Sequence, residues 1–235
     1  MKQIFFILSS LLYLQTSIGQ VGSGGLHGSL NMNSGDFFLI NLKNATNVDA
    51  FNPDIYANVE GSPYLSSDWL YARIKLEDNS NYDSVLVKVN FFESKIHFRD
   101  ENGKEKMVAI PVKELEIIDN RSPLNKSVYV SGYGDDKNEF YQAITDGKKA
   151  GLLKKMKVII KEHKVFNAPP QKKFESDAIY YIYANKLLYE QTKNCSALVE
   201  AFKNDAKIIK FISSNDVKCN KEKDLKNLVE YYNSY

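Results

Sequence analysis

The chain has 235 residues, of which 43% are hydrophobic and 26% are charged, and its formal net charge is +2. This balance is ordinary for a globular protein and excludes global disorder, which needs low hydrophobicity together with high net charge. A near-neutral charge also argues against a nucleic-acid-binding module, because such modules carry a strong basic excess.

Residues 1–19 are predicted to form a secretory signal peptide. Lys2 supplies the positive charge, Ile4 to Leu14 form an apolar run, and Ser17-Ile18-Gly19 resembles a cleavage site. We expect the mature chain to begin at Gln20 and to be exported, either periplasmic or secreted. No later segment reaches the roughly 18 apolar residues of a membrane-spanning helix, so we expect no transmembrane anchor in the mature chain.

Residues 20–62 are predicted to hold a flexible leader and a first strand. Gly22 to Ser29 is rich in glycine, which leaves the backbone free and offers little to bury. Phe37 to Leu42 is the expected strand. Turns are predicted at Asn52-Pro53-Asp54 and at Gly61-Ser62-Pro63.

Residues 63–121 are predicted to form an antiparallel β meander. Period-two alternation begins after Trp69 and repeats in several short runs, which gives a sheet with one dry and one wet face. Asn102-Gly103 supplies the positive φ angles of a tight hairpin turn. The apolar positions of the runs are Leu70, Ala72, Ile74, Leu76, Val85, Val87, Val89, Ile96, Phe98, Leu115 and Ile117.

Residues 122–192 are predicted to form a second β-rich region, interrupted by an exposed linker at Ala168-Pro169-Pro170 because proline donates no ladder hydrogen bond. We therefore expect an α+β fold, mainly β, with antiparallel meander sheets forming a sandwich or an incomplete barrel, in one large or two small domains. The predicted strands lie near Ser127 and over Phe140–Thr145, Leu152–Ile160, Ala178–Tyr183 and Leu187–Tyr189.

Residues 193–235 are predicted to form a short C-terminal helical segment, because apolar residues recur there at steps of three and four. Asn220 is the expected N-cap of the last helix, and Glu222 in its first turn suits the helix dipole. Cys195 and Cys219 lie in this segment. An exported chain permits a disulfide between them, worth roughly 3 kcal/mol, and two free buried thiols are the alternative.

The sequence carries no recognisable catalytic motif. His27, His97 and His163 are each expected at the solvated surface, and no zinc-protease, serine-hydrolase, Walker or Rossmann pattern occurs. Asp135-Asp136, with Asn138 and Glu139, offers oxygen ligands but lacks the EF-hand order, so we expect a solvated turn. We predict no catalytic, metal-binding or cofactor-binding residue.

Charge is unevenly distributed along the chain. Residues 20–147 carry 12 Lys and Arg against 19 Asp and Glu, whereas residues 148–235 carry 18 against 10. This asymmetry has three explanations. The two halves attract each other, the basic C-terminal region contacts an anionic surface, or the lysines form a solvated face.

Tyr180, Tyr181 and Tyr183 share a predicted strand, and exposed tyrosines stack on sugars or bases or form protein interfaces. The candidate interaction surface comprises Tyr181, Tyr183, Lys221, Lys223 and Lys226.

Three stretches of the chain carry a family resemblance. They are Pro63-Tyr64-Leu65 with Asp68-Trp69, Phe140-Tyr141-Gln142 with Asp146-Gly147-Lys148, and Lys223-Asp224-Leu225 with Leu228 to Ser234. In these stretches the chain resembles a family of uncharacterised exported β-rich proteins common in Bacteroidota-type bacteria. The resemblance covers most of the mature chain, is weakest between residues 20 and 60, implies a bacterial envelope setting and assigns no functional residue.

Two hypotheses about function follow. The first is a non-catalytic envelope or secreted module, binding or structural, whose partner is an envelope protein, an anionic envelope polymer or a lipid surface, and not a nucleic acid. The second is a hydrolase acting on an envelope polymer through two carboxylates that spacing does not identify, held about 5 to 9.5 Å apart across a cleft.

Overall fold

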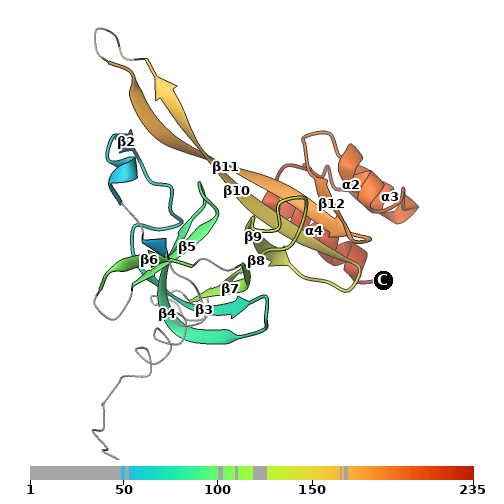
Figure 1. Ribbon diagram of the computed structural model, residues 1–235. Coiled ribbons are helices and arrows are strands. Elements are labelled where there is room, and N and C mark those ends of the chain that lie inside the picture. Colours follow the sequence, from blue (N-terminus) through green and yellow to red (C-terminus); the bar gives the residue numbers. More distant parts are fainter. Residues whose placement is uncertain are drawn as a thin grey trace, which may run out of the picture. The chain divides into compact units, whose positions relative to one another are not determined.

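The computed structural model describes residues 49–50, 53–99, 103–108, 111–118, 126–164, 166 and 169–235, all within one compact unit, Met32–Tyr235. The predicted signal peptide, the glycine-rich leader, the strand expected over 37–42 and His27 lie outside the described residues. The described part is mainly β and ends in three short helices (Figure 1). The coarse fold class predicted from the sequence is therefore confirmed.

The strands of the described part belong to one sheet. They are β1 (Asp49–Ala50), β2 (Val59–Glu60), β3 (Leu70–Leu76), β4 (Asn81–Asn90), β5 (Lys95–Arg99), β6 (Glu105–Met107), β7 (Val112–Ile118), β8 (Lys126–Val130), β9 (Tyr141–Thr145), β10 (Ala150–His163), β11 (Gln171–Ala184) and β12 (Leu187–Glu190). The helices are the short 3-10 helix η1 (Pro53–Tyr56) and the α-helices α2 (Ser196–Ala201), α3 (Ala206–Ser214) and α4 (Glu222–Asn233).

The strand order joins the two predicted β regions. It runs β1-β6-β5-β4-β3-β7-β8-β9-β10-β11-β12 with antiparallel neighbours, and β2 pairs with β11 in parallel. The meander and the second β-rich region therefore continue into each other through β7, β8 and β9. The described strands do not close into a barrel, and the predicted sandwich of two sheets is not confirmed.

A first hydrophobic cluster lies along β3, β4, β5, β7 and β8. The alternation predicted for β3 is present, since Ala72, Ile74 and Leu76 are buried while Tyr71 and Arg73 are exposed. Burying each large apolar side chain contributes roughly 1.5 to 3 kcal/mol, so this cluster is a main source of stability. Other members are Val85, Val87, Val89, Ile96, Phe98, Leu115, Ile117 and Tyr129.

The prediction of a solvated His97 is wrong. Its side chain is fully buried, its Nδ1 lies 2.7 Å from Oε1 of Glu105, and its ring packs edge-on against Tyr64. Strand β5 lies between β4 and β6, and three consecutive residues of it are buried, so the rule of one wet face fails there. His163, by contrast, is exposed as predicted, with its Nε2 3.0 Å from Oε1 of Glu175.

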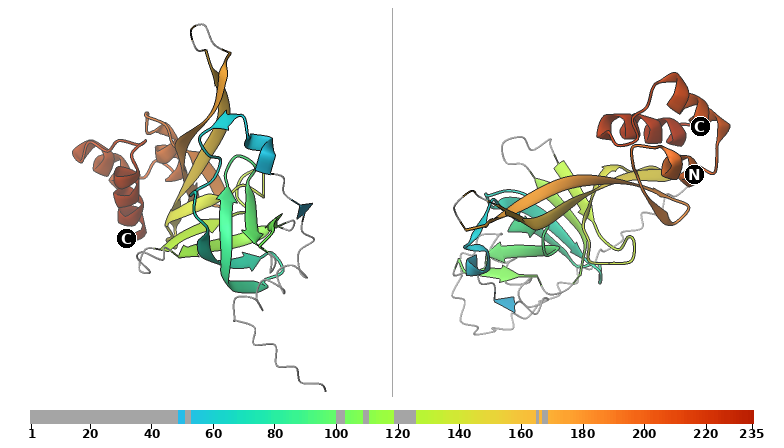
Figure 2. Two further views of the ribbon diagram at one scale, coloured as in Figure 1. Left: turned by 90° about the vertical axis from the view of Figure 1, so that its left-hand side faces the viewer. Right: turned by 90° about the horizontal axis from the view of Figure 1, so that it is seen from above.

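A second hydrophobic cluster joins the helices to the sheet. Figure 2 shows the three α-helices gathered beside β10, β11 and β12. A disulfide joins Cys195, just before α2, to Cys219, between α3 and α4, across a separation of 24 residues. The apolar side chains of this cluster include Ala150, Leu152, Ile182, Leu198, Phe202, Ile208, Leu225, Leu228 and Val229.

The start of α4 differs from the prediction. The N-cap position is occupied by Lys221, which makes no side-chain capping hydrogen bond, and not by Asn220. Glu222 and Asp224 do lie in the first turn, where acidic groups suit the positive end of the helix dipole. Asp224 Oδ2 also accepts a hydrogen bond from the backbone N–H of Lys218 at 3.0 Å, which ties the preceding loop to the helix.

Candidate functional site

The tyrosines of β11 divide between the two faces of the sheet. Tyr180 donates a hydrogen bond to Glu222 of α4 at 3.2 Å, and Ile182 belongs to the cluster shared with the helices. Because side chains alternate along a strand, Tyr181 and Tyr183 lie on the opposite face. We call the two sides of β10 and β11 the helix face and the groove face.

The structure does not bring the predicted interaction residues together. Lys221, Lys223 and Lys226 are exposed at the start and along the length of α4, which packs on the helix face. Tyr181 and Tyr183 are half-buried on the groove face. The sheet therefore separates the lysines from the tyrosines, and a single ligand surface does not include both sets.

Two further tyrosines join Tyr181 and Tyr183 on the groove face. Tyr133, in the loop between β8 and β9, packs edge-to-face against Tyr183 with ring centroids 4.7 Å apart. Tyr141 of β9 lies 6.1 Å from Tyr133 and 5.5 Å from Tyr181, again edge-to-face. We call these four rings the tyrosine cluster. Such pairs contribute about 0.5 to 1.5 kcal/mol each beyond their buried area, so the cluster is held in place before any ligand arrives.

Carboxylates fix the hydroxyl groups of the cluster. Tyr141 donates to Oε2 of Glu139 at 2.9 Å, and Tyr181 donates to Oε2 of Glu190 at 3.2 Å. Burial, with a smaller contribution from Glu190, raises the pKa of Tyr181 to about 12. Burial and the hydrogen bond to Glu139 raise the pKa of Tyr141 as well. Both phenols therefore stay protonated and neutral over the physiological pH range.

The loop that carries Tyr133 is closed by its own lysine. The side chain of Lys137 donates to the carbonyl oxygens of Gly132 and Gly134, at 3.2 and 2.7 Å. Both glycines have positive φ, +86° and +65°. A Cβ on Gly134 would also lie 3.3 Å from the hydroxyl oxygen of Tyr141, so a side chain there would crowd the cluster.

The loop's acidic turn is solvated, as the sequence predicts. Asp135 and Asp136 are exposed, and Asp136 Oδ1 accepts a hydrogen bond from the backbone of Asn138 at 2.9 Å. Among the residues that the structure describes, no group of three or more His, Cys, Asp or Glu side chains is arranged to hold a metal ion.

Two hollows flank the Tyr133–Tyr183 pair and share Tyr133, Tyr183 and Lys186 in their linings. We call the two together the tyrosine groove. Their volumes are about 750 and 920 Å³, which suits a ligand of several rings. The apolar or small residues of the lining are Val128, Val130, Ala143, Gly151, Leu153 and Leu188.

The rim of the tyrosine groove carries both signs of charge. Carboxylates outnumber lysines there, so the groove offers more hydrogen-bond acceptors than cationic donors. The acidic residues are Glu114, Asp135, Asp136, Glu139, Asp146 and Glu190, and the basic ones are Lys137, Lys148, Lys149 and Lys186.

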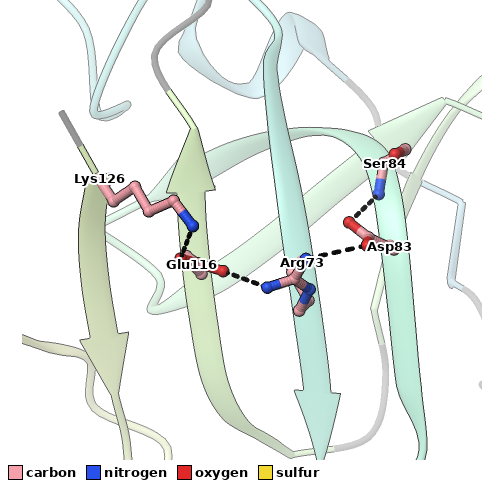
Figure 3. Close-up of polar contacts among 5 residues, drawn as sticks. All are labelled: Arg73, Asp83, Ser84, Glu116 and Lys126. Atoms are coloured by element: carbon pink, nitrogen blue, oxygen red, sulfur yellow. Dashed lines mark hydrogen bonds and ion pairs between the residues drawn. The ribbon is translucent and has the colours of Figure 1, made fainter. Parts of the chain in front are cut away.

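An ion-pair network lies next to the groove on the same side of the sheet. Arg73 contacts Glu116 at 2.7 Å and Asp83 at 3.0 Å, and Lys126 contacts Glu116 at 2.8 Å (Figure 3). Glu116 pairs across the sheet with Val128, which lines the groove. The charges of this network neutralise each other, whereas the lining of the adjoining groove combines tyrosine rings with an excess of carboxylates over lysines.

No family model, no curated protein and no solved structure matches this chain. The family resemblance drawn from the sequence therefore stays a prediction. Within the described residues, none of the helices has the length and apolar character needed to cross a membrane.

Proposed function

We propose that this chain is an exported, non-catalytic binding module of the bacterial envelope, and that the tyrosine groove holds its ligand, a stretch of an envelope polymer built from sugar rings. The observation that carries the proposal is the tyrosine cluster, which places four rings on one face of the sheet, with Tyr133 and Tyr183 lining both hollows.

The chemistry of the groove suits a carbohydrate. A sugar ring has an apolar face that packs on an aromatic ring, and hydroxyl groups around its edge that need hydrogen-bond acceptors. Tyr133 and Tyr183 supply the rings, and the carboxylates of the rim supply the acceptors. The cluster is also preformed by its internal contacts, which lowers the entropic cost of binding.

The groove favours binding over hydrolysis. A glycoside hydrolase needs one carboxyl group to donate a proton and a second to act as base or nucleophile. Glu139 is already engaged by the Tyr141 hydroxyl and by the ammonium group of Lys155. Glu190 accepts from Tyr181. These carboxylates orient tyrosines, which is a structural task, so the hydrolase is the second candidate.

Co-sedimentation of the mature chain with purified peptidoglycan sacculi, and in parallel with envelope polysaccharide coupled to beads, tests the proposal. The Tyr183→Ala variant should lose about tenfold in affinity, as expected for an aromatic anchor in a groove. Tyr71→Ala is the matched control, because Tyr71 is an exposed strand tyrosine that does not line the groove. Equal binding of Tyr183→Ala and wild type would contradict the proposal.

A second readout separates the two candidates. Release of reducing ends from the polymer by the wild-type chain, abolished in Glu139→Gln, would favour the hydrolase. Binding without release of reducing ends would favour the binding module.

A further inference from the structure

Two cationic side chains share the ring of Trp69 on the part of the sheet formed by β3, β4 and β5. The ammonium nitrogen of Lys88, on β4, lies 5.2 Å from the centre of the indole ring, and the guanidinium carbon of Arg99, on β5, lies 4.6 Å from it. The same nitrogen of Lys88 lies 5.3 Å from the centre of the Tyr64 ring. We call Tyr64, Trp69, Lys88 and Arg99 the cationic patch.

Strand pairing places the two cations on one face of the sheet. Lys88 lies between Val87 and Val89, which are buried in the first hydrophobic cluster, so its side chain points to the opposite face. Lys88 is the cross-strand partner of His97, and Arg99 follows His97 by two residues on β5. Side chains two residues apart share a face, so Lys88 and Arg99 emerge on the same side.

Neither cation of the patch is neutralised by a carboxylate of the described residues. Glu105 is the cross-strand partner of Arg99, but its Oε1 lies 2.7 Å from Nδ1 of His97, and it forms no ion pair with Arg99. Lys88 likewise contacts the two aromatic rings and, within the described part of the chain, no acidic group. The patch therefore carries two positive charges that lack a counterion from these residues.

The two charges are close enough to repel each other. Both lie near the centre of one ring, so their separation is within about 10 Å, the Debye length at 0.1 M salt. The faces of Trp69 and Tyr64 attract the cations and hold them in place, but they leave the net charge unchanged. An anion that contacts both cations removes this repulsion, so the patch is preorganised for anion binding.

The geometry of two different cations selects among anions. The guanidinium group of Arg99 is a planar fork that donates two parallel hydrogen bonds to a carboxylate or a phosphate, and the ammonium group of Lys88 adds a point charge. A carboxylate has one charge and two oxygens, which Arg99 alone satisfies. A phosphate monoester has a charge of about −1.5 to −2 near neutral pH and three terminal oxygens, so it can engage both cations.

We propose that the cationic patch binds the phosphate group of a phosphorylated sugar. Arg99 donates two hydrogen bonds to the phosphate and Lys88 donates a third, while the half-buried rings of Tyr64 and Trp69 beside them provide surface on which the apolar face of the sugar packs. The patch shares no residue with the tyrosine groove, so this proposal stands or falls without the proposed function.

Titration of the mature chain with glucose 6-phosphate, followed by nuclear magnetic resonance, is the first test. Trp69 is the one tryptophan of the chain, so its indole N–H gives a single identifiable signal. We expect this signal to shift with a Kd of about 1 mM or tighter at low salt, and the Kd to rise about tenfold at high salt. Glucose should leave the signal in place, and glucuronate, with one charge on the same ring, should bind about tenfold more weakly. No binding of glucose 6-phosphate, or equally tight binding of glucose or glucuronate, would overturn the proposal.

Inorganic phosphate, titrated in the same way, separates the phosphate from its carrier. It should shift the Trp69 signal but bind more weakly than glucose 6-phosphate, because it lacks the ring that packs on Tyr64 and Trp69. Inorganic phosphate that binds as tightly as glucose 6-phosphate would overturn the assignment of a sugar.

Protein variants complete the experiment. Arg99→Lys keeps the charge but loses the fork of donors, and Lys88→Gln loses one charge, so each should weaken binding of glucose 6-phosphate about tenfold. Lys113→Gln is the matched control, because it removes one positive charge from an exposed position on β7 and should change the Kd by less than about twofold. Urea unfolding checks that the three variants fold. Unchanged binding by folded Arg99→Lys and Lys88→Gln, or an equal loss in Lys113→Gln, would overturn the proposal.

Discussion

The side chain of Asn233, at the end of α4, pairs with the backbone of Ala150 as an adjacent strand would. Asn233 Nδ2 donates to the carbonyl oxygen of Ala150 at 2.8 Å, and Asn233 Oδ1 accepts from the N–H of Ala150 at 3.1 Å. The N–H of Lys149 donates to the same Oδ1 at 3.0 Å. The side-chain amide of Asn233 therefore provides hydrogen-bond partners for the backbone at the start of β10, next to the end of α4.

Replacing Asn233 by alanine should lower the free energy of unfolding by about 1 to 3 kcal/mol, because part-buried backbone groups of β10 lose their partners. Urea unfolding followed by far-ultraviolet circular dichroism measures the change. Asn227→Ala, at an exposed position of the same helix, is the control and should change stability by less than about 0.5 kcal/mol. Similar losses in both variants would show that the Asn233 contacts contribute no more than helix propensity.

Gly147 is required by the same contact. A Cβ at this position would lie 2.2 Å from Nδ2 of Asn233, which forces one of the two to move. Gly147→Ala should therefore destabilise the fold by about 1 to 3 kcal/mol. In the Asn233→Ala background the penalty should largely vanish, which a double-mutant cycle in urea measures. Additive effects would mean that the two residues do not oppose each other.

The Cys195–Cys219 disulfide should stabilise the helical segment by about 2 to 5 kcal/mol, because it removes conformations from the unfolded chain. The Cys195→Ser, Cys219→Ser double variant should melt at a lower temperature than the oxidised wild type, by differential scanning calorimetry. Adding a reductant should lower the wild-type melting temperature and leave the variant unchanged. A wild type that is insensitive to reductant would contradict this expectation.

The Arg73–Asp83 ion pair should stabilise the fold in a pH-dependent way. The hydrogen bond from Arg73 is the largest cause that lowers the pKa of Asp83. A carboxyl whose pKa is lowered by folding stabilises the native state above its unfolded pKa of about 3.9, and this contribution is lost as pH falls through the lower folded value. Asp83→Asn should therefore cost less than about 1 kcal/mol at neutral pH, because both side chains are largely exposed.

Urea unfolding at pH 7 and near pH 2 measures this difference. The stabilities of wild type and Asp83→Asn should converge at the lower pH. A constant difference across the range would show that the side chain acts through packing and not through its charge.

The lysines of α4 provide a separate test of envelope attachment. If Lys221, Lys223 and Lys226 contact an anionic envelope surface, the triple alanine variant should bind native bacterial envelopes less than wild type at low salt, and the difference should disappear at high salt. Co-sedimentation measures this. A triple alanine variant at three exposed lysines elsewhere, Lys95, Lys113 and Lys164, is the matched control. Equal loss in the two variants would point to net charge alone.

Local patterns in the sequence predicted the individual elements well. Alternation placed β3 and β4, steps of three and four residues placed α2 to α4, and the paired runs near Ala178 and Leu187 placed the hairpin of β11 and β12. These signals are local, since each depends only on which face of one element is apolar. His97 shows the limit, because its side chain is buried by contacts with residues distant in the sequence, the ring of Tyr64 and the carboxylate of Glu105.

The candidate site was only half predictable. Tyr181 and Tyr183 were identified as surface tyrosines, but Tyr133 and Tyr141 were not connected with them. Their meeting depends on the order β8-β9-β10-β11 and on a register shift between β9 and β10 at Leu152 and Leu153, which no local pattern encodes. The only signal for Tyr133 is the pair of glycines on either side of it. They predict a tight loop, but they do not predict which strands that loop packs against.

The separation of the aromatic residues also gives the molecule two optical reporters. Its one tryptophan, Trp69, lies outside the tyrosine groove, with the charged ends of Lys88 and Arg99 5.2 and 4.6 Å from its ring. Fluorescence of Trp69 therefore reports on the β3–β5 part of the sheet. The tyrosine cluster contributes instead to the near-ultraviolet circular dichroism spectrum, because its rings are held close together. A ligand that enters the groove should therefore change the circular dichroism spectrum and leave the fluorescence of Trp69 unchanged.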